Sequence, residues 1–203
     1  MKENNIVEAI RAYDRALELT DDAPAAHAGG ILLRRANAYA AMAAKQRESL
    51  SEMVQSMAES IPNESTLKTV YALAKRETTL SIPLFRRIQA NSLSQAAQMR
   101  RIECANGLYQ HALLKALEDA LGATKVLPKY GTAWKSVAAV LSDLWRLDES
   151  LDCYQRAMAL SPNLREELDR AIVGVQVRKN LLKDSATWDW PEEALRLALN
   201  VKG

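Results

Sequence analysis

Few side chains in this sequence have the types and spacing that catalysis or metal binding requires. His27 and His111 lie far apart, and neither has a second ligand one helical turn away. Acidic pairs such as Asp148-Glu149 fall at expected helix starts or on outer faces, where carboxylates stay solvated or meet the positive end of the helix dipole. Gly29-Gly30 follows no strand and precedes no Lys-Ser/Thr pair, as a phosphate loop would need. We therefore expect no enzyme, no cofactor and no metal.

A different chemistry is suggested by three cations, Arg34, Arg101 and Lys135, which recur on three expected helices. If these helices line one groove, the cations can hold acidic side chains or the C-terminal carboxylate of an extended peptide. The alternative is that the long cationic side chains only solvate the surface. The choice between the two hypotheses depends on the helices that position these residues.

The composition indicates an all-α protein with an ordinary core. Of the 203 residues, 48% are hydrophobic and 26% are charged, and the helix formers Ala, Leu, Glu, Arg and Lys dominate. The 27 basic and 25 acidic residues give a net charge of only +2. A net charge this small gives no reason to expect nucleic acid or an anionic membrane as a partner.

Two further features bear on where the protein works. The sequence shows no secretory pattern at its N-terminus and no apolar run long enough to span a bilayer, so we expect an intracellular, cytoplasmic protein. Cys104 and Cys153 fall in helical patterns beside apolar neighbours, which favours two buried free thiols. One disulfide is the alternative in a secreted chain.

Residues 131–163 have the clearest pattern, that of two helices joined by a turn. Trp134, Val137, Ala138 and Leu141 are three or four residues apart, as one helical face requires. A second helix over 149–160 ends at Ser161-Pro162-Asn163, because proline cannot continue it. Small residues at 138, 150 and 157 let two backbones approach, while larger ones fill the space between them. The segment is therefore predicted to be a helical hairpin.

The same pattern recurs at a step of 34 residues, which places Pro128 under Pro162 and Ala123 under Ala157. With this spacing the chain resembles the tetratricopeptide repeat (TPR) family. The residues that carry the resemblance are Trp134, Val137, Ala138, Leu141, Ser150, Tyr154, Ala157 and Pro162. The resemblance implies a right-handed superhelix of helical hairpins that binds a partner peptide or helix in a concave groove, as an adaptor or assembly subunit. It does not imply chaperone-tail binding, because the Lys, Arg and Asn positions of that clamp fall on Thr132, Ser136 and Ile102.

The predicted domain organisation is a TPR-like domain over 1–183 and a C-terminal loop and helix over 184–203, which Trp188 and Trp190 anchor to the domain. Within the domain we expect helix pairs at 25–44 with 46–60 and at 93–110 with 113–127, a divergent insertion at about 62–91, and a capping helix from Leu164 to Leu182. The first helix, 4–17, lacks a pairing helix. Either the natural chain begins earlier, or a partner contact covers the exposed face of this helix.

The predicted groove residues follow from this arrangement. They lie beside the packing face on the first helix of each helical hairpin. They are Arg34, Asn37, Arg101, Tyr109, Lys135 and Ser142. The expected partner is a protein segment, acidic where it meets the cations. Two alternatives stay open, an RNA-binding helical repeat and the regulatory domain of an enzyme.

Overall fold

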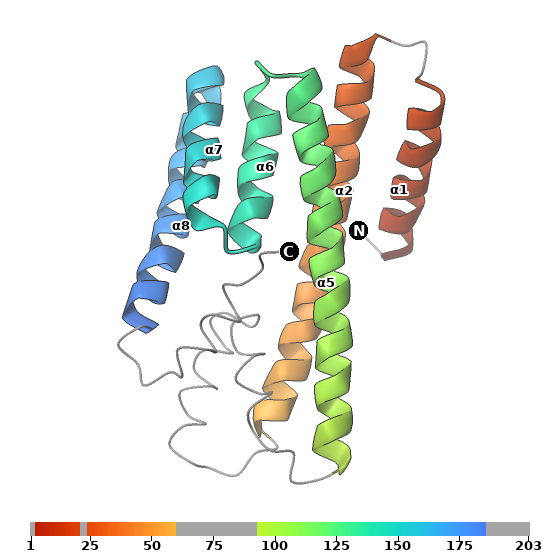
Figure 1. The fold of residues 1–203 in the computed structure, drawn as a ribbon, viewed down its shortest axis with the longest axis vertical. Coiled ribbons are helices and arrows are strands. Elements are labelled where there is room, and N and C mark those ends of the chain that lie inside the picture. Colours follow the sequence, from red (N-terminus) through yellow and green to blue (C-terminus); the bar gives the residue numbers. More distant parts are fainter. Residues whose placement is uncertain (1–2, 21–23, 60–92, 186–203) are drawn as a thin grey trace. The chain divides into compact units, whose positions relative to one another are not determined.

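A computed structural model of the chain describes residues 3–20, 24–59 and 93–185, and nearly all of these residues are helical (Figure 1). No strand occurs in these three ranges, so the predicted all-α class is confirmed. The helices are α1 (Glu3–Glu18), α2 (Ala25–Glu59), α5 (Leu93–Val126), α6 (Gly131–Asp143), α7 (Leu147–Leu160) and α8 (Arg165–Ser185), with a short 3-10 helix at Pro162–Leu164.

The two helix pairs predicted at 25–60 and 93–127 are wrong, because α2 and α5 each continue without a turn. The stretches expected to turn are Ala-Ala-Lys-Gln-Arg at 43–47 and Tyr-Gln-His-Ala-Leu at 109–113. Neither contains Gly, Pro, Asn, Asp or Ser, which end helices or form turns. Without such a residue the helical backbone continues, and each predicted pair becomes one long helix.

The chain divides into two compact units. Unit 1 contains residues 1–42 and 111–185, and unit 2 contains residues 43–110 and 186–203. The division falls within α2 and within α5. The predicted insertion at about 62–91 and the segment 186–203, with Trp188 and Trp190, lie outside the described residues.

In unit 1 the predicted hairpin of residues 131–163 is confirmed as α6 and α7. Ala138, Ser150 and Ala157 are 0% exposed, so the small residues lie at the helix contact as expected. The Ser150 hydroxyl donates a hydrogen bond of 2.7 Å to the carbonyl oxygen of Ala138. A Cβ added to Gly131 would lie 2.8 Å from the Ala157 carbonyl oxygen. The small residues therefore bring the two backbones into close contact.

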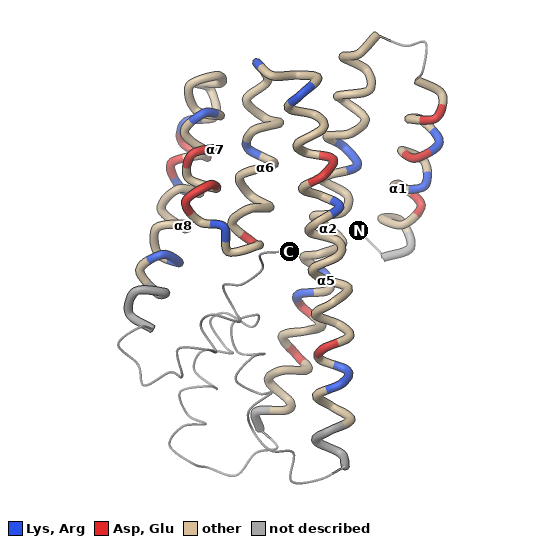
Figure 2. Tube along the Cα trace, viewed as in Figure 1, with Lys and Arg blue, Asp and Glu red and all other residues tan. Residues whose placement is uncertain are grey.

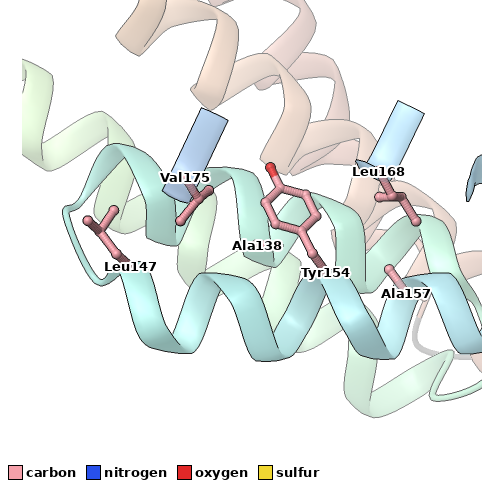
Figure 3. Packing of buried hydrophobic residues seen from close by; sticks show 6 residues of the cluster. All are labelled: Ala138, Leu147, Tyr154, Ala157, Leu168 and Val175. Atoms are coloured by element: carbon pink, nitrogen blue, oxygen red, sulfur yellow. The ribbon is translucent and has the colours of Figure 1, made fainter. Parts of the chain in front are cut away.

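The third helix of this group, α8, packs on the hairpin through a few deeply buried side chains. Figure 3 shows Tyr154 of α7 pointing between Leu168 and Val175 of α8, with Ala138 of α6 nearby. Leu168 and Val175 are buried, whereas Val173 and Val177 on α8 are exposed. One apolar edge of α8 therefore completes the core of the hairpin, as the predicted capping helix requires.

At the other side of unit 1, α1, α2 and α5 are joined by one charged cluster. The Arg35 guanidinium donates to both carboxylate oxygens of Asp119, each at 2.7 Å, and to Asp14 Oδ1 at 2.6 Å. Ile6 and Ile10 on α1 are buried within the chain itself. The expectation that the apolar face of α1 is exposed and needs a partner is therefore wrong.

In unit 2, apolar side chains on the second half of α2 are buried. Leu50, Val54 and Met57 are inside, as are Ile102 and Tyr109 on α5. Four amide side chains of this unit have a buried oxygen without a hydrogen-bond partner in the structure. They are Gln46, Gln98, Asn106 and Gln110.

The two cysteines are free, as predicted, but they are not both buried. Cys104 is exposed, which corrects the prediction, and Cys153 is partly buried. Position 104 lies on the outer side of a continuous helix instead of at a helix–helix contact, because the expected hairpin does not form. Within the described ranges, no helix is long and apolar enough to cross a membrane.

Candidate functional site

A hollow of about 200 Å³ opens on unit 1 where α2, α6 and α8 meet above α7. The residues that line it are Ala36, Asn37, Ala40, Lys135, Ser136, Ala139, Val140, Tyr154, Glu167, Leu168 and Ala171. Four of these are alanines, and at least one alanine comes from each of α2, α6 and α8. The hollow exists because short side chains stand where longer ones would fill the space between the helices.

The floor of the hollow is apolar, and its residues are buried. Ala36, Val140 and Leu168 are buried, and so is Tyr154, whose ring forms one wall. Burial raises the pKa of Tyr154 to about 12. The phenol is neutral at physiological pH, and its ring supplies apolar surface to the hollow.

The rim of the hollow is polar, and its charges are paired. Lys135 Nζ on α6 lies 3.0 Å from Glu167 Oε1 on α8. The Ser136 hydroxyl on α6 donates to Asn37 Oδ1 on α2 at 3.2 Å. These two contacts connect α6 to α8 and to α2. Because the one cation of the rim is paired with the one anion, the rim carries no net charge.

The structure brings together two of the six predicted groove residues, Asn37 and Lys135, at this rim. Arg34 is exposed on α2 and does not line the hollow. Ser142 is buried, and both its hydroxyl and its carbonyl oxygen accept hydrogen bonds from Arg178, at 2.9 and 3.1 Å. The other two residues belong to unit 2, where Arg101 is exposed and Tyr109 is 2% exposed.

The side of the hollow that α8 contributes was not predicted from the sequence, because that helix was expected only to cap the domain. Glu167 and Ala171 therefore did not enter the prediction. A signal for the α2 side was present in the sequence, since Ala36 lies three steps of 34 residues before Ala138. The Ser136–Asn37 hydrogen bond shows that α2 is the neighbour of α6.

Charged residues of both signs occur on the described helices. Figure 2 shows them interspersed on α1 and α8, whereas α7 carries Asp148, Glu149 and Asp152 against the one cation Arg156. His27 and His111 are both exposed, and no three His, Cys, Asp or Glu side chains of the described ranges come together as a metal ion would need. The arrangement offers an apolar hollow with a neutral polar rim.

No family model matches this chain, and no curated protein or solved structure matches it.

Proposed function

We propose that this protein is a protein-interaction module, an adaptor or assembly subunit that holds a segment of a partner protein against α2, α6 and α8. The observation that carries the proposal is the alanine-lined hollow at the meeting point of these three helices. Interfaces are anchored by side chains that fill such pockets near the centre of the contact.

The size of the hollow favours an anchor side chain over a free small molecule. Small-molecule sites typically enclose about 300 to 1,000 Å³, whereas this hollow measures about 200 Å³. A partner segment can place one side chain in the hollow while the rest of the segment lies across the rim. The proposed function therefore rests on a macromolecular partner.

Hydrogen bonds that join α7 and α8 to α6 support the same function. The Ser150–Ala138 hydrogen bond holds α7 to α6, and Arg178 of α8 binds the Ser142 carbonyl near the end of α6. A preformed site loses little conformational entropy when a partner binds. The hollow is thus available in the free protein.

We further propose that α2, α6 and α8 act as successive first helices of a TPR-like superhelix. Ala36 and Ala138 are separated by three 34-residue steps, and both are buried. In this arrangement the unit 1 parts of α2 and α5 form one helix pair of the repeat, and the residues of unit 2 are inserted between them. The hollow then lies on the concave side, where such repeats bind their partners.

Site-specific photo-cross-linking tests the proposed function. A photoreactive amino acid replaces Ala139 on the hollow, and in a matched variant it replaces Ala159, which is exposed on α7 away from the hollow. In cells that make the protein, we expect position 139 to cross-link to one protein segment that mass spectrometry identifies, and position 159 not to cross-link to it. Cross-links to RNA at position 139, weakened by added salt, would instead support the RNA-binding alternative.

A further inference from the structure

We infer that the hollow selects a partner segment by one uncharged apolar side chain, of the size of leucine, methionine or phenylalanine. This inference rests on the proposed function and specifies the chemistry of the partner. It replaces the acidic ligand that the sequence suggested with a neutral anchor.

The charges at the rim argue for a neutral anchor. Lys135 is the cation of the hollow, and its ammonium group is already paired with Glu167 at 3.0 Å. An acidic side chain would have to compete with Glu167 for Lys135, and a basic one would have to compete with Lys135 for Glu167. Because the two charges cancel, neither sign of ligand gains a net attraction, and an apolar side chain leaves the ion pair intact.

The floor argues for an apolar anchor. Ala36, Val140, Leu168 and the ring of Tyr154 present carbon atoms to the hollow. A charged group placed among them would lose hydration, and the uncharged hydroxyl of Tyr154 offers it no opposite charge. An apolar side chain instead removes both its own surface and the floor from water.

The volume sets the size of this anchor. A cavity of about 150 Å³ can hold a benzene molecule, and the hollow is about 200 Å³. The side chains of leucine, methionine and phenylalanine therefore fit, whereas an alanine methyl group would leave most of the hollow empty. A void without partner atoms forfeits dispersion contacts.

The test uses the full chain with ¹³C-labelled alanine methyl groups, which report directly on Ala36, Ala40, Ala139 and Ala171. The probes are the N-acetyl amides of single amino acids, titrated at equal ionic strength while the methyl signals are recorded. Leucine, methionine and phenylalanine amides represent the proposed anchor. Alanine, aspartate and lysine amides represent a smaller, an acidic and a basic side chain.

We expect the three larger apolar amides to shift these methyl signals saturably, and on the order of tenfold more tightly than the other amides. The Ala139→Leu variant should abolish the shifts, and the matched Ala159→Leu variant should keep them. In Glu167→Gln, which leaves Lys135 without its acidic partner, the aspartate amide should bind more tightly than in the unsubstituted protein.

Preferential binding of the aspartate or lysine amide to the unsubstituted protein would overturn the inference, as would the absence of shifts with every probe. The proposed function is judged separately by the cross-link at position 139. A cross-link to an acidic or basic partner segment would leave the function standing and remove the neutral anchor. Selective binding of the larger apolar amides, without any protein cross-linked at position 139, would leave the neutral anchor standing and remove the proposed function.

Discussion

The α6–α7 hairpin and the long helices α2 and α5 share the same alternation of small and large apolar residues, yet only the hairpin turns. Its turn lies between Asp143 and Leu147, where Trp145 has a φ of 62° and the helix ends in the left-handed conformation. In α2 the corresponding stretch, 43–47, contains only residues that favour a helix. The side-chain sizes thus determine which faces pack, while local backbone chemistry determines where the chain reverses.

The two regions are also held by different interactions. In the hairpin the contact depends on close backbones, as the Ser150–Ala138 hydrogen bond shows. Between α2 and α5 an apolar cluster that includes Leu33 and Ala123 is joined by the bidentate ion pair of Arg35 with Asp119, whose side chain is 5% exposed. Substitutions in the two regions should therefore lower the stability of the protein for different physical reasons.

The continuity of α2 is tested by Lys45→Pro, for which we expect the largest effect. Proline inside a helix removes a backbone hydrogen bond and clashes with the preceding turn, at a cost of about 3 kcal/mol or more. The free energy of unfolding, measured by urea denaturation followed by circular dichroism, should fall by that amount. Lys45→Ala is the control and should unfold near the unsubstituted protein. Equal free energies of unfolding for Lys45→Pro and Lys45→Ala would mean that α2 turns near residue 45, as the chain does between α6 and α7.

The ion pair between α2 and α5 is tested by Asp119→Ala. This change leaves the Arg35 guanidinium partly buried with only Asp14 as a partner, and we expect a loss of about 3 kcal/mol in the free energy of unfolding. The neighbouring Glu118 is exposed and pairs with Lys115 on the surface, so Glu118→Ala should leave the unfolding midpoint nearly unchanged. Equal midpoints for the two variants would show that the buried pair contributes nothing to stability.

The close packing of the hairpin is tested by Ala157→Leu. Ala157 is fully buried at the contact with α6, so a leucine there overpacks the helix interface and should cost about 1 to 3 kcal/mol. Ala159→Leu, two residues along α7 and exposed, adds the same atoms without a contact. Thermal melts in which the two variants behave alike would mean that the small residues do not determine the approach of the helices.

The smallest expected effect concerns the turn itself, at Trp145. A residue other than glycine in the left-handed conformation costs about 1 kcal/mol. Trp145→Ala keeps this strain and Trp145→Gly removes it, while both lose the indole ring. The glycine variant should therefore be more stable than the alanine variant by about 1 kcal/mol in chemical denaturation. The reverse order would show that the positive φ of this residue stores no strain.

The sequence was sufficient to predict the all-α class, the α6–α7 hairpin and the burial of Ala138 and Ala157, because these depend on local spacing. It did not predict that α2 continues through residue 45, since apolar periodicity carries no information about where a helix ends. For the same reason Arg101 was assigned to a groove with Lys135, although the two residues belong to different units.

The hollow was predictable only in part. Asn37 and Lys135 were identified from their position on a helical face, and both line it. The pairing of Lys135 with Glu167 was not predictable, because it depends on how α8 packs against α6. Likewise, nothing in the local sequence around Asp119 indicates that it is buried. Its partner Arg35 lies on a different helix, and only the fold brings them together.

The most direct test of the central claim is the affinity of the cross-linked partner segment for the hollow. Isothermal titration calorimetry of a synthetic peptide with that sequence would compare the unsubstituted protein, Ala139→Leu and Ala159→Leu. If the segment occupies the hollow, Ala139→Leu should weaken binding by on the order of tenfold or more, and Ala159→Leu should bind as the unsubstituted protein does. Equal affinity for all three proteins would contradict the account, because the partner would then bind outside α2, α6 and α8.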